Sequence, residues 1–458
     1  MKKSKKIIST LLALTMAFSL SACGAKDKST SAEKEKDSIP TIDQIKLGED
    51  YTDLKADLKV ITHRTDLVDN VFKDYISEFQ KTYPNISIEY EGITNYADDI
   101  TTRLTSSSWG DICMVPPSIS KSELSNYFVS FGDLDTLEKN YIMLQDKAYD
   151  NEVYGIPSVG NAQGVVYNKK VFADAGITEL PKTPDEFLDA LQQIKDKTDA
   201  IPLYTNFNAQ WTMTAWDAYV GGTSNGDPDY IMKKMVHGKN PFSKNDDMTG
   251  PYAVYYVLYE SVARGLVEDD PTTTDWEGCK GQINNGKIGT MVLGSWAVSQ
   301  MQAAGDHPDD IAYMPFPITV NGKQYASAGP DYQYGINVNA SKENKIASMI
   351  YIKWLTEKSD FAFDQGSIPI MKGSDYPDVL DAFSDTELII NNPAKEGEED
   401  YFDTINSDSE VGLNSDNVPD SQIVEHALAK DMTLDEIMDE WNQKWSQAQK
   451  DNDIEVEE

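Results

Sequence analysis

Aromatic and amide side chains gather in two short stretches, residues 206–211 and 216–219. The first reads Asn-Phe-Asn-Ala-Gln-Trp and ends at Trp211, and the second reads Trp-Asp-Ala-Tyr and contains Asp217. An aromatic ring packs on a flat C–H surface, and amide or carboxylate groups pair with hydroxyl groups. Sugars offer both features. We therefore expect Trp211 to stack on a sugar ring in a cleft and Asp217 to bind hydroxyls, whereas Trp216 suits the core.

Charged and aromatic residues also lie next to the ends of predicted strands. Residues 58–62 predict the first strand, and Arg64 and Asp66 follow its carboxyl end. Ligands collect at this edge of open α/β sheets, and an arginine can pair with two hydroxyls at once. The alternative is a solvated pair of charges. Trp109 precedes a later predicted strand and can either cap the site or pack in the core.

Four further candidates lie in polar segments between predicted strands. Asn161 and Gln163 belong to residues 158–163, and Asp331 and Tyr332 interrupt the glycine-containing run 325–337. Their side chains can donate and accept hydrogen bonds. We expect these four residues to line the same cleft.

The elements that position these residues alternate between strand and helix. Apolar residues recur at helical spacing from Val71 to Tyr83, and Pro84 ends that helix. Strands are expected at residues 86–90 and 110–115, with a helix over 96–107 between them. Such alternation predicts a largely parallel sheet.

Residues 153–183 organise the middle of the chain. Two β-favouring runs flank the polar segment 158–163, which predicts two strands joined by an irregular crossing. A short helix should follow and stop near Gly176. Thr183 is a plausible N-cap for the next helix, with Pro184 at its first position.

The order of motifs resembles a known family. Tyr-Gly-Ile-Pro at 154–157, Tyr-Asn-Lys at 167–169 and Pro-Lys-Thr at 181–183 precede a strand from Lys287 and a Gly-Ser-Trp turn at 294–296. This order resembles the extracellular solute-binding proteins of ABC importers, in the branch that carries maltose and other sugars. The resemblance implies that Trp296 stacks on a sugar ring. The alternative is a tryptophan that packs in the core at the start of a helix.

The same resemblance implies the fold and the role. We expect an α/β, two-lobed, periplasmic-binding-protein-like fold of class II type, each lobe a mainly parallel sheet flanked by helices, with three hinge crossings. Lobe 1 would comprise residues 58–159 and 328–375, and lobe 2 residues 160–327 and 376–458. The lobes would close on a carbohydrate, expected to be an oligosaccharide, and a monomeric protein would deliver it to the permease subunits without catalysis or a cofactor.

The amino terminus resembles a lipoprotein signal. Four lysines precede an apolar run over residues 7–20, and Leu-Ser-Ala leads into Cys23. The resemblance implies cleavage after residue 22 and a diacylglycerol on Cys23. Two acyl chains would anchor the protein stably at the outer face of a Gram-positive membrane. A plain secretory signal is the alternative. Residues 23–57 are highly charged and predict a flexible tether.

Composition excludes several other roles. The net charge of −36 disfavours binding to nucleic acid. The chain has 3 Cys and 4 His, and the His residues are scattered, so a zinc site or a Cys–His nucleophile is unsupported. We expect Cys113 and Cys279 to be free thiols, with Cys113 buried.

Two alternatives remain open. A glycoside hydrolase would need two carboxylates about 5 to 10 Å apart across a cleft, and no catalytic signature accompanies the abundant Asp and Glu. The same scaffold can also bind a polyamine, a peptide or another organic solute. A cleft lined by several unpaired carboxylates would favour the polyamine, whereas the aromatic and amide residues around Trp211 favour the sugar.

Overall fold

The computed structural model describes residues 39–414 and 419–457, and the chain from Thr41 onward forms one compact unit. The predicted signal peptide, Cys23 and the predicted tether as far as residue 38 lie outside the described residues. Within those described ranges, no helix is long and apolar enough to cross a membrane.

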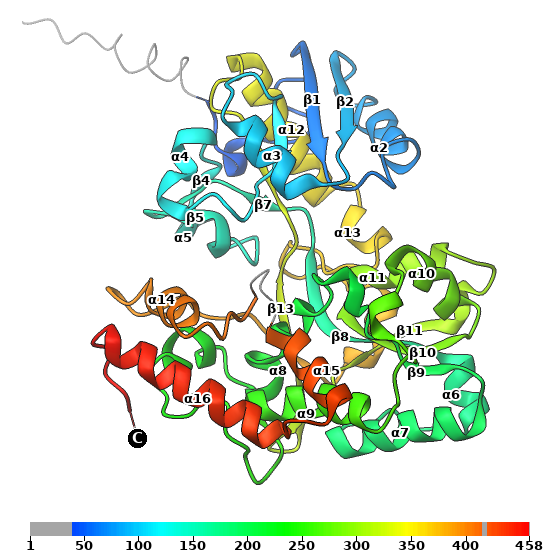
Figure 1. Ribbon diagram of the computed structural model, residues 1–458. Coiled ribbons are helices and arrows are strands. Elements are labelled where there is room, and N and C mark those ends of the chain that lie inside the picture. Colours follow the sequence, from blue (N-terminus) through cyan, green and yellow to red (C-terminus); the bar gives the residue numbers. More distant parts are fainter. Residues whose placement is uncertain (1–38, 415–418, 458) are drawn as a thin grey trace, which may run out of the picture. The chain divides into compact units, whose positions relative to one another are not determined.

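The first lobe contains a five-stranded sheet with helices around it (Figure 1). Its elements are β1 (Ala56–Thr62), α2 (Val71–Phe79), β2 (Ile86–Gly92), α3 (Tyr96–Leu104), β3 (Ile112–Met114), β7 (Ile156–Pro157), β14 (Gln333–Ile336), α12 (Lys342–Glu357) and α13 (Phe361–Asp364). The strand order is β2-β1-β3-β14-β7. A small three-stranded sheet adjoins it, made of β4 (Gly132–Asp133), β5 (Ala148–Tyr149) and β6 (Glu152–Val153), with α4 (Leu124–Tyr127) and α5 (Leu134–Leu137) nearby in the chain.

The second lobe contains a seven-stranded sheet in the order β12-β13-β8-β10-β9, with β11 on β8 and β15 on β13. Its strands are β8 (Gly160–Asn168), β9 (Ile201–Leu203), β10 (Ile288–Gly294), β11 (Ile311–Pro315), β12 (Thr319–Val320), β13 (Lys323–Pro330) and β15 (Glu387–Ile389). Its helices are α6 (Lys169–Ala175), α7 (Pro184–Lys197), α8 (Gly222–Asn225), α9 (Gly250–Ala263), α10 (Trp276–Asn284), α11 (Trp296–Ala303), α14 (Tyr401–Asp408), α15 (Pro419–Ala429) and α16 (Leu434–Asp451).

Both sheets are mixed, so the prediction of mainly parallel sheets is wrong although the α/β, two-lobed class is confirmed. Among the strands of the described residues, β1 pairs in parallel with β2 and β3, β10 with β9, and β13 with β15. β14 is antiparallel to β3 and β7, and β8 is antiparallel to β10, β11 and β13. Helices connect β1 to β2 and β9 to β10, which pair in parallel, whereas β8 and β14 follow a crossing directly and run antiparallel to their neighbours.

Local signals behave as the sequence predicts between β8 and α7. Asn168 caps α6, which ends at Gly176 in the left-handed conformation with φ of 78°. Thr183 caps α7 by accepting a hydrogen bond from the Glu186 backbone N–H, and Pro184 is the first helical residue.

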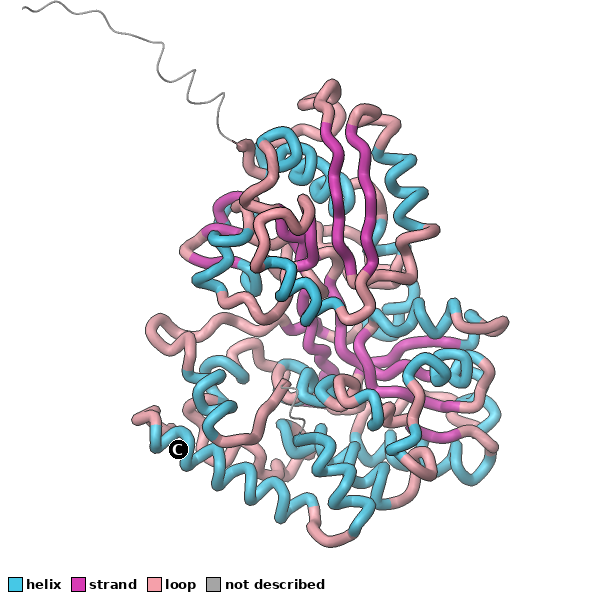
Figure 2. Tube along the Cα trace, turned by 45° about the horizontal axis from the view of Figure 1, so that its top comes forward, coloured by secondary structure: helices cyan, strands magenta, loops and turns pink. Residues whose placement is uncertain are grey.

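The crossings lie side by side where the two sheets meet. The first residues of β8 pair with the last residues of β13, from Ala162 with Ala328 to Gly160 with Pro330. On a third segment, Ile368 exchanges two backbone hydrogen bonds of 2.7 and 2.8 Å with Gly160. The second and third crossings thus supply strand partners, so Gly160 to Gln163 continue β8 instead of forming an irregular segment. In Figure 2 the strands form two groups with the crossing strands between them.

Residues 41–57, predicted to be part of the tether, are packed against the first lobe. Ile42 and Ile45 are buried, and the Ile42 N–H donates to the Phe131 carbonyl at 2.9 Å. The Gly48 N–H donates to the Tyr83 hydroxyl at 2.8 Å. The two isoleucines anchor this segment despite the charged residues around them.

Candidate functional site

A cavity of about 1150 Å³ is lined by residues from both lobes and from the crossings. The first lobe contributes residues that follow β1, β2 and β3, which places them at the carboxyl ends of its parallel strands. The second lobe contributes residues at the starts of α10 and α11. The lining residues are His63, Arg64, Thr94–Asp98, Val115, Pro117, Asp146, Lys147, Asn161, Gln163, Trp211, Trp276, Trp296, Gln300 and Gly329–Gln333.

Three tryptophans form the second-lobe wall of this cavity. The ring centroids of Trp211 and Trp276 are 4.9 Å apart with an interplanar angle of 82°, and those of Trp211 and Trp296 are 5.7 Å apart at 47°. Trp276 and Trp296 lie 5.8 Å apart. The Trp211 side chain is 44% exposed, so it presents aromatic surface to the cavity. We call these three residues the tryptophan cluster.

Helix starts hold two members of the cluster in place. Trp276 is the first residue of α10, whose N-cap Asp275 accepts from the Glu277 N–H at 3.1 Å. Trp296 is the first residue of α11 and follows the end of β10 at Gly294. A Cβ added to Gly294 would lie 2.5 Å from Trp296 Nε1, so this indole position requires glycine there.

The opposite wall is polar, and its Arg64, Asp146 and Lys147 are each paired with an opposite charge. Arg64 donates to both carboxylate oxygens of Asp66, at 2.9 and 2.7 Å, and to Gln365 Oε1 at 2.9 Å. Burial alone would raise the pKa of Asp66, but the hydrogen bonds and charge of Arg64 hold it below its usual value. Asp146 lies 3.4 Å from Lys147 Nζ and accepts from Gln333 Nε2 at 2.9 Å.

A hydrogen-bonded network crosses the floor of the cavity at the hinge. Asn161 Nδ2 donates to Asp331 Oδ2 at 3.0 Å, and Ser295 Oγ donates to Asn161 Oδ1 at 3.3 Å. The Tyr332 N–H donates to Asp331 Oδ1 at 2.6 Å. Because β8, the β13–β14 crossing and α11 all contribute, this network ties the ligand-facing groups to the crossings.

His63 lies between the hinge and the first lobe. Its ring centroid is 4.7 Å from that of Tyr332 and 5.9 Å from that of Tyr96. Burial lowers its pKa; Asp331 opposes this shift with a negative charge, and Arg64 adds to it with a positive one.

Seven of the ten predicted ligand-binding residues line the cavity, namely Arg64, Asn161, Gln163, Trp211, Trp296, Asp331 and Tyr332. Asp66 does not line it and instead pairs with Arg64. Trp109 is 5% exposed and packs edge-on against Phe128, so it belongs to the core. Asp217 is also buried and does not line the cavity. The Tyr255 hydroxyl and the Asn414 N–H both donate to its carboxylate.

Sequence reasoning missed His63, Trp276 and Gln333. His63 directly follows β1 and precedes Arg64, so the strand-end argument applied to Arg64 also points to it. Trp276 stands at the start of a helix, a signal that does not distinguish a ligand platform from a core residue. Gln333 begins β14, where the sequence shows only a strand.

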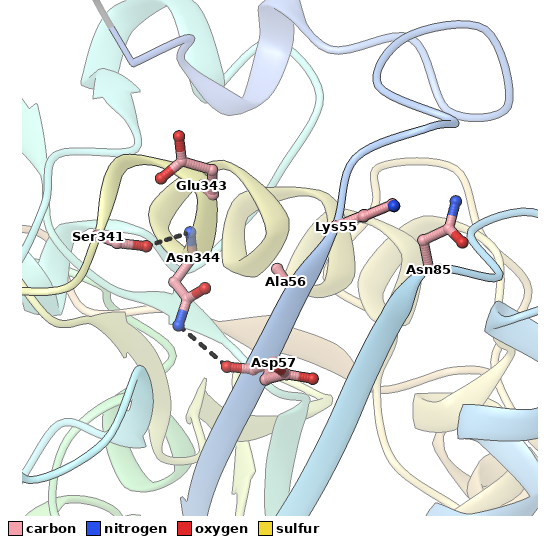
Figure 3. Close-up of a pocket in the computed structure, with 7 residues that line it drawn as sticks. All are labelled: Lys55, Ala56, Asp57, Asn85, Ser341, Glu343 and Asn344. Carbon is pink, nitrogen blue, oxygen red and sulfur yellow. Dashed lines mark hydrogen bonds between the residues drawn. The ribbon is translucent and has the colours of Figure 1, made fainter.

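A second hollow of about 560 Å³ lies at the amino ends of β1 and β2 (Figure 3). It is lined by Lys55, Ala56, Asp57, Asn85, Ser341, Glu343 and Asn344. Two of its polar groups already bond to each other, since Asn344 Nδ2 donates to the Asp57 carbonyl at 3.0 Å. The aromatic wall makes the larger cavity the better candidate for an organic ligand.

Neither a metal cluster nor a disulfide forms in the part of the chain that the structure describes. That part contains no group of three or more His, Cys, Asp or Glu able to hold a metal ion. Cys113 and Cys279 are free thiols, and both are buried.

Known proteins share the fold and much of the sequence. A manno-oligosaccharide-specific solute-binding protein from Bifidobacterium animalis subsp. lactis, solved with mannotriose, is 50% identical, with a TM-score of 0.84 over 90% of this chain and 99% of that chain. A second binding protein of an ABC transporter from the same organism, solved with mannobiose, is 51% identical with the same coverage and TM-score.

A curated relative is more distant. The diacetylchitobiose binding protein DasA of Streptomyces coelicolor is 32% identical over 137 residues, which span 29% of this chain and about a third (32%) of that protein.

Residues 65–360 match the sequence profile of the family described as bacterial extracellular solute-binding protein. That match covers well over half of the chain and includes the first two crossings and the tryptophan cluster. The family and the solved neighbours are binding proteins and not enzymes. The predicted family is therefore confirmed: the chain belongs to the bacterial extracellular solute-binding proteins.

Proposed function

We propose that this protein binds a manno-oligosaccharide in the cavity between its lobes and delivers it to the permease of an ABC importer. The observation that carries the proposal is the tryptophan cluster, which faces a polar wall across a cavity of about 1150 Å³. The solved neighbours at 50 and 51% identity, which hold mannotriose and mannobiose, support manno-oligosaccharides as the ligand class.

Each wall suits one part of a sugar chain. The indole faces of the tryptophan cluster can stack on the C–H faces of successive rings. Asn161, Gln163 and Asp331 can pair with hydroxyls from the crossings, because an amide both donates and accepts whereas a carboxylate accepts. Binding of this kind requires no catalytic step and no cofactor.

Asp146 and Asp331, two of the three acidic side chains that line the cavity, already have partners, which favours a neutral ligand over a polyamine. Asp146 is paired with Lys147, and the carboxylate of Asp331 accepts from Asn161 and from the Tyr332 N–H. A polyamine would need carboxylates free to pair with its ammonium groups. The rival ligand class is thus disfavoured by the contacts of these acidic groups.

Delivery follows from hinge closure and anchoring. The lobes, with the boundaries predicted from the sequence, would close on the sugar by bending at the crossings, and the ligand would increase the population of the closed form. A monomer anchored through diacylglycerol on Cys23, at the outer face of the membrane, would keep the closed form close to the permease.

The proposal is tested by titrating a soluble form, residues 39–458, with sugars in a calorimeter. Mannobiose and mannotriose should bind, whereas maltotriose, cellotriose, spermidine and a short peptide should bind far more weakly. At about 100 times its dissociation constant, a ligand should stabilise the fold by about 2.7 kcal/mol. Binding of spermidine or peptide alone, or release of mannose during the titration, would overturn the proposal.

Two substitutions test the tryptophan cluster directly. Trp211→Ala and Trp296→Ala should each weaken mannotriose binding by roughly 10- to 100-fold, since a central aromatic anchor contributes about 2 kcal/mol or more. Tyr376→Ala is the matched control, because Tyr376 is 48% exposed, comparable to Trp211, and does not line the cavity. Wild-type affinity in both tryptophan variants would exclude stacking on this cluster.

A further inference from the structure

His63 and Asp331 face each other at the cavity across a gap of defined size. His63 Nε2 lies 4.0 Å from Asp331 Oδ1. That distance is too long for a direct hydrogen bond. It does allow one oxygen atom to sit about 2.8 Å from both atoms, with an angle of about 90° at that oxygen. A single hydroxyl group can therefore bridge the two side chains, accepting from one and donating to the other.

Asp331 is held in place for this role. Its Oδ1 accepts from the Tyr332 N–H at 2.6 Å, and its Oδ2 accepts from Asn161 Nδ2 at 3.0 Å. A carboxylate oxygen has more than one lone pair, so Oδ1 can accept a second hydrogen bond. Asp331 lies on the β13–β14 crossing, whereas His63 follows β1, so the first lobe and the hinge each supply one half of the pair.

The surroundings of His63 favour the neutral imidazole. Its Nδ1 is buried and has no hydrogen-bond partner among residues 39–414 and 419–457. Protonation of Nδ1 would leave a buried N–H without an acceptor, which is unfavourable. In the neutral ring, the carboxylate of Asp331 favours the proton on Nε2, the nitrogen that faces it.

Several charged and aromatic groups face this imidazole. Burial lowers the pKa of His63 most, Arg64 lowers it further, and the negative charges of Asp331 and Asp66 raise it. The rings of Tyr332 and Tyr96 pack against it. The net result is a pKa below the usual value of about 6.5.

We propose that His63 and Asp331 together bind one hydroxyl group of the sugar. His63 Nε2–H donates a hydrogen bond to the hydroxyl oxygen, and Asp331 Oδ1 accepts a hydrogen bond from the hydroxyl O–H. This inference rests on the proposed function. Protonated His63 would form an ion pair with Asp331, which competes with the hydroxyl for both side chains. The affinity for a neutral sugar should therefore fall as the pH is lowered, with His63 as a specificity-determining residue.

The test is calorimetric titration of residues 39–458 with mannotriose between pH 7.5 and pH 5.0. The wild type should bind more weakly once the pH falls below the lowered pKa of His63, because protonation removes the hydrogen bonds that the neutral imidazole and Asp331 make to the hydroxyl. His63→Gln should bind about tenfold more weakly than the wild type at pH 7.5 and show little further change on acidification. Asp331→Asn should also lose the pH dependence.

His307→Gln is the matched control. His307 is exposed and does not line the cavity, so this variant should follow the wild-type profile at every pH. Mannotriose does not titrate in this range, which assigns any change to the protein. Circular dichroism and thermal unfolding at each pH would show that the variants are folded.

The outcomes separate this inference from the proposed function. Wild-type affinity in both His63→Gln and Asp331→Asn at pH 7.5, or a His63→Gln variant that loses affinity on acidification as the wild type does, would overturn the shared hydroxyl site while sugar binding itself remains. A wild type that binds no manno-oligosaccharide at any pH would overturn the proposed function, and with it this inference.

Discussion

At the scale of single residues, the position of Trp296 depends on the absence of a side chain at Gly294. A Cβ at Gly294 would lie 2.5 Å from Nε1 and 2.7 Å from Cδ1 of Trp296. We expect Gly294→Ala to displace the indole and to weaken mannotriose binding by about tenfold. Overpacking should also lower the free energy of unfolding by about 1–3 kcal/mol. Calorimetric titration and urea unfolding would measure the two effects.

Gly281→Ala, in α10, is the control for this substitution. Its added Cβ would meet only the Ala304 carbonyl, at an ordinary contact distance of 3.5 Å. Affinity in this variant should match the wild type. If Gly294→Ala also binds normally, the position of the Trp296 indole does not matter for recognition.

The sequence predicts part of the site at this scale, and the reason is chemical. Trp211 lies among amides, so its neighbours identify it, whereas Trp296 is identified by the resemblance of its Gly-Ser-Trp turn to a family motif. Asp217 has similar neighbours, yet it is buried under Tyr255 and Asn414, which lie 38 and 197 residues further along the chain. Neighbouring sequence cannot reveal such distant partners, and the same holds for Trp109 against Phe128.

At the scale of elements, two buried carboxylates join the 3₁₀ helix Thr214–Tyr219 to α15. Asp217 is 3% exposed and Asp420 fully buried. The oxygens of Asp420 have no hydrogen-bond partner among the described residues. Burial raises the pKa of Asp217 to about 6, and burial together with the charge of Asp217 raises the pKa of Asp420 well above its usual value.

These shifts make the protein less stable as the pH rises. An unfolded aspartate gives up its proton near pH 3.9, so stability falls from about pH 4 upward, through the folded pKa of about 6 for Asp217 and on through the higher pKa of Asp420. We expect Asp420→Asn, whose amide can donate to Asp217, to raise the free energy of unfolding at pH 7.5 and to reduce this pH dependence. Urea unfolding from pH 4 to 7.5 would measure it. Asp439→Asn, exposed on α16, should behave as the wild type, and an unchanged pH slope for Asp420→Asn would contradict the expectation.

His237 links other elements, and its contribution to stability also falls as the pH rises. Its Nε2 lies 3.0 Å from Glu398 Oε2 and its Nδ1 lies 2.7 Å from the Glu455 carbonyl. Burial would lower its pKa, but the bonds to Glu398 and Glu455 raise it above the usual value. The stabilisation is therefore complete below the unfolded value of about pH 6.5 and is lost as the pH rises through the folded pKa.

Substitution of His237 tests this link to the carboxyl-terminal segment. His237→Gln should destabilise the fold more at pH 5.5 than at pH 8.5, as measured by urea unfolding at both values. His307→Gln, at an exposed position, should change stability equally little at either pH. A larger loss for His237→Gln at pH 8.5 would show that packing, and not charge, is what this histidine contributes.

At the scale of the whole molecule, the sequence predicts elements better than their pairing. The helix α7 and the strands β1 and β2 follow from local periodicity and caps. The direction of β14 and the continuation of β8 depend on partners such as Met114, Ala328 and Ile368, which are remote in the chain. Likewise, Ile42 and Ile45 are buried against the first lobe. The charged residues that surround them in the chain give no sign of this packing.

The proposed role requires the lobes to move, and the chain is well suited to measuring this. Burial raises the pKa of Cys279 to about 12 and that of Cys113 further, so neither natural thiol should react readily with a label. Lys73 on α2 and Asp189 on α7 are exposed, one on each lobe. A Lys73→Cys/Asp189→Cys variant carrying two spin labels would report the distance between the lobes.

We expect mannotriose to shift the Lys73–Asp189 distance distribution toward one shorter, narrower peak, since the ligand favours the closed form. Asp189→Cys/Gln447→Cys, with both labels on the second lobe, should show no shift. Trp296→Ala should need more sugar to reach the same short distance, because it weakens binding without altering the closed geometry. If saturating mannotriose leaves the inter-lobe distance unchanged, the ligand binds without closure, and the permease would have to recognise the bound sugar by some feature other than the approach of the two lobes.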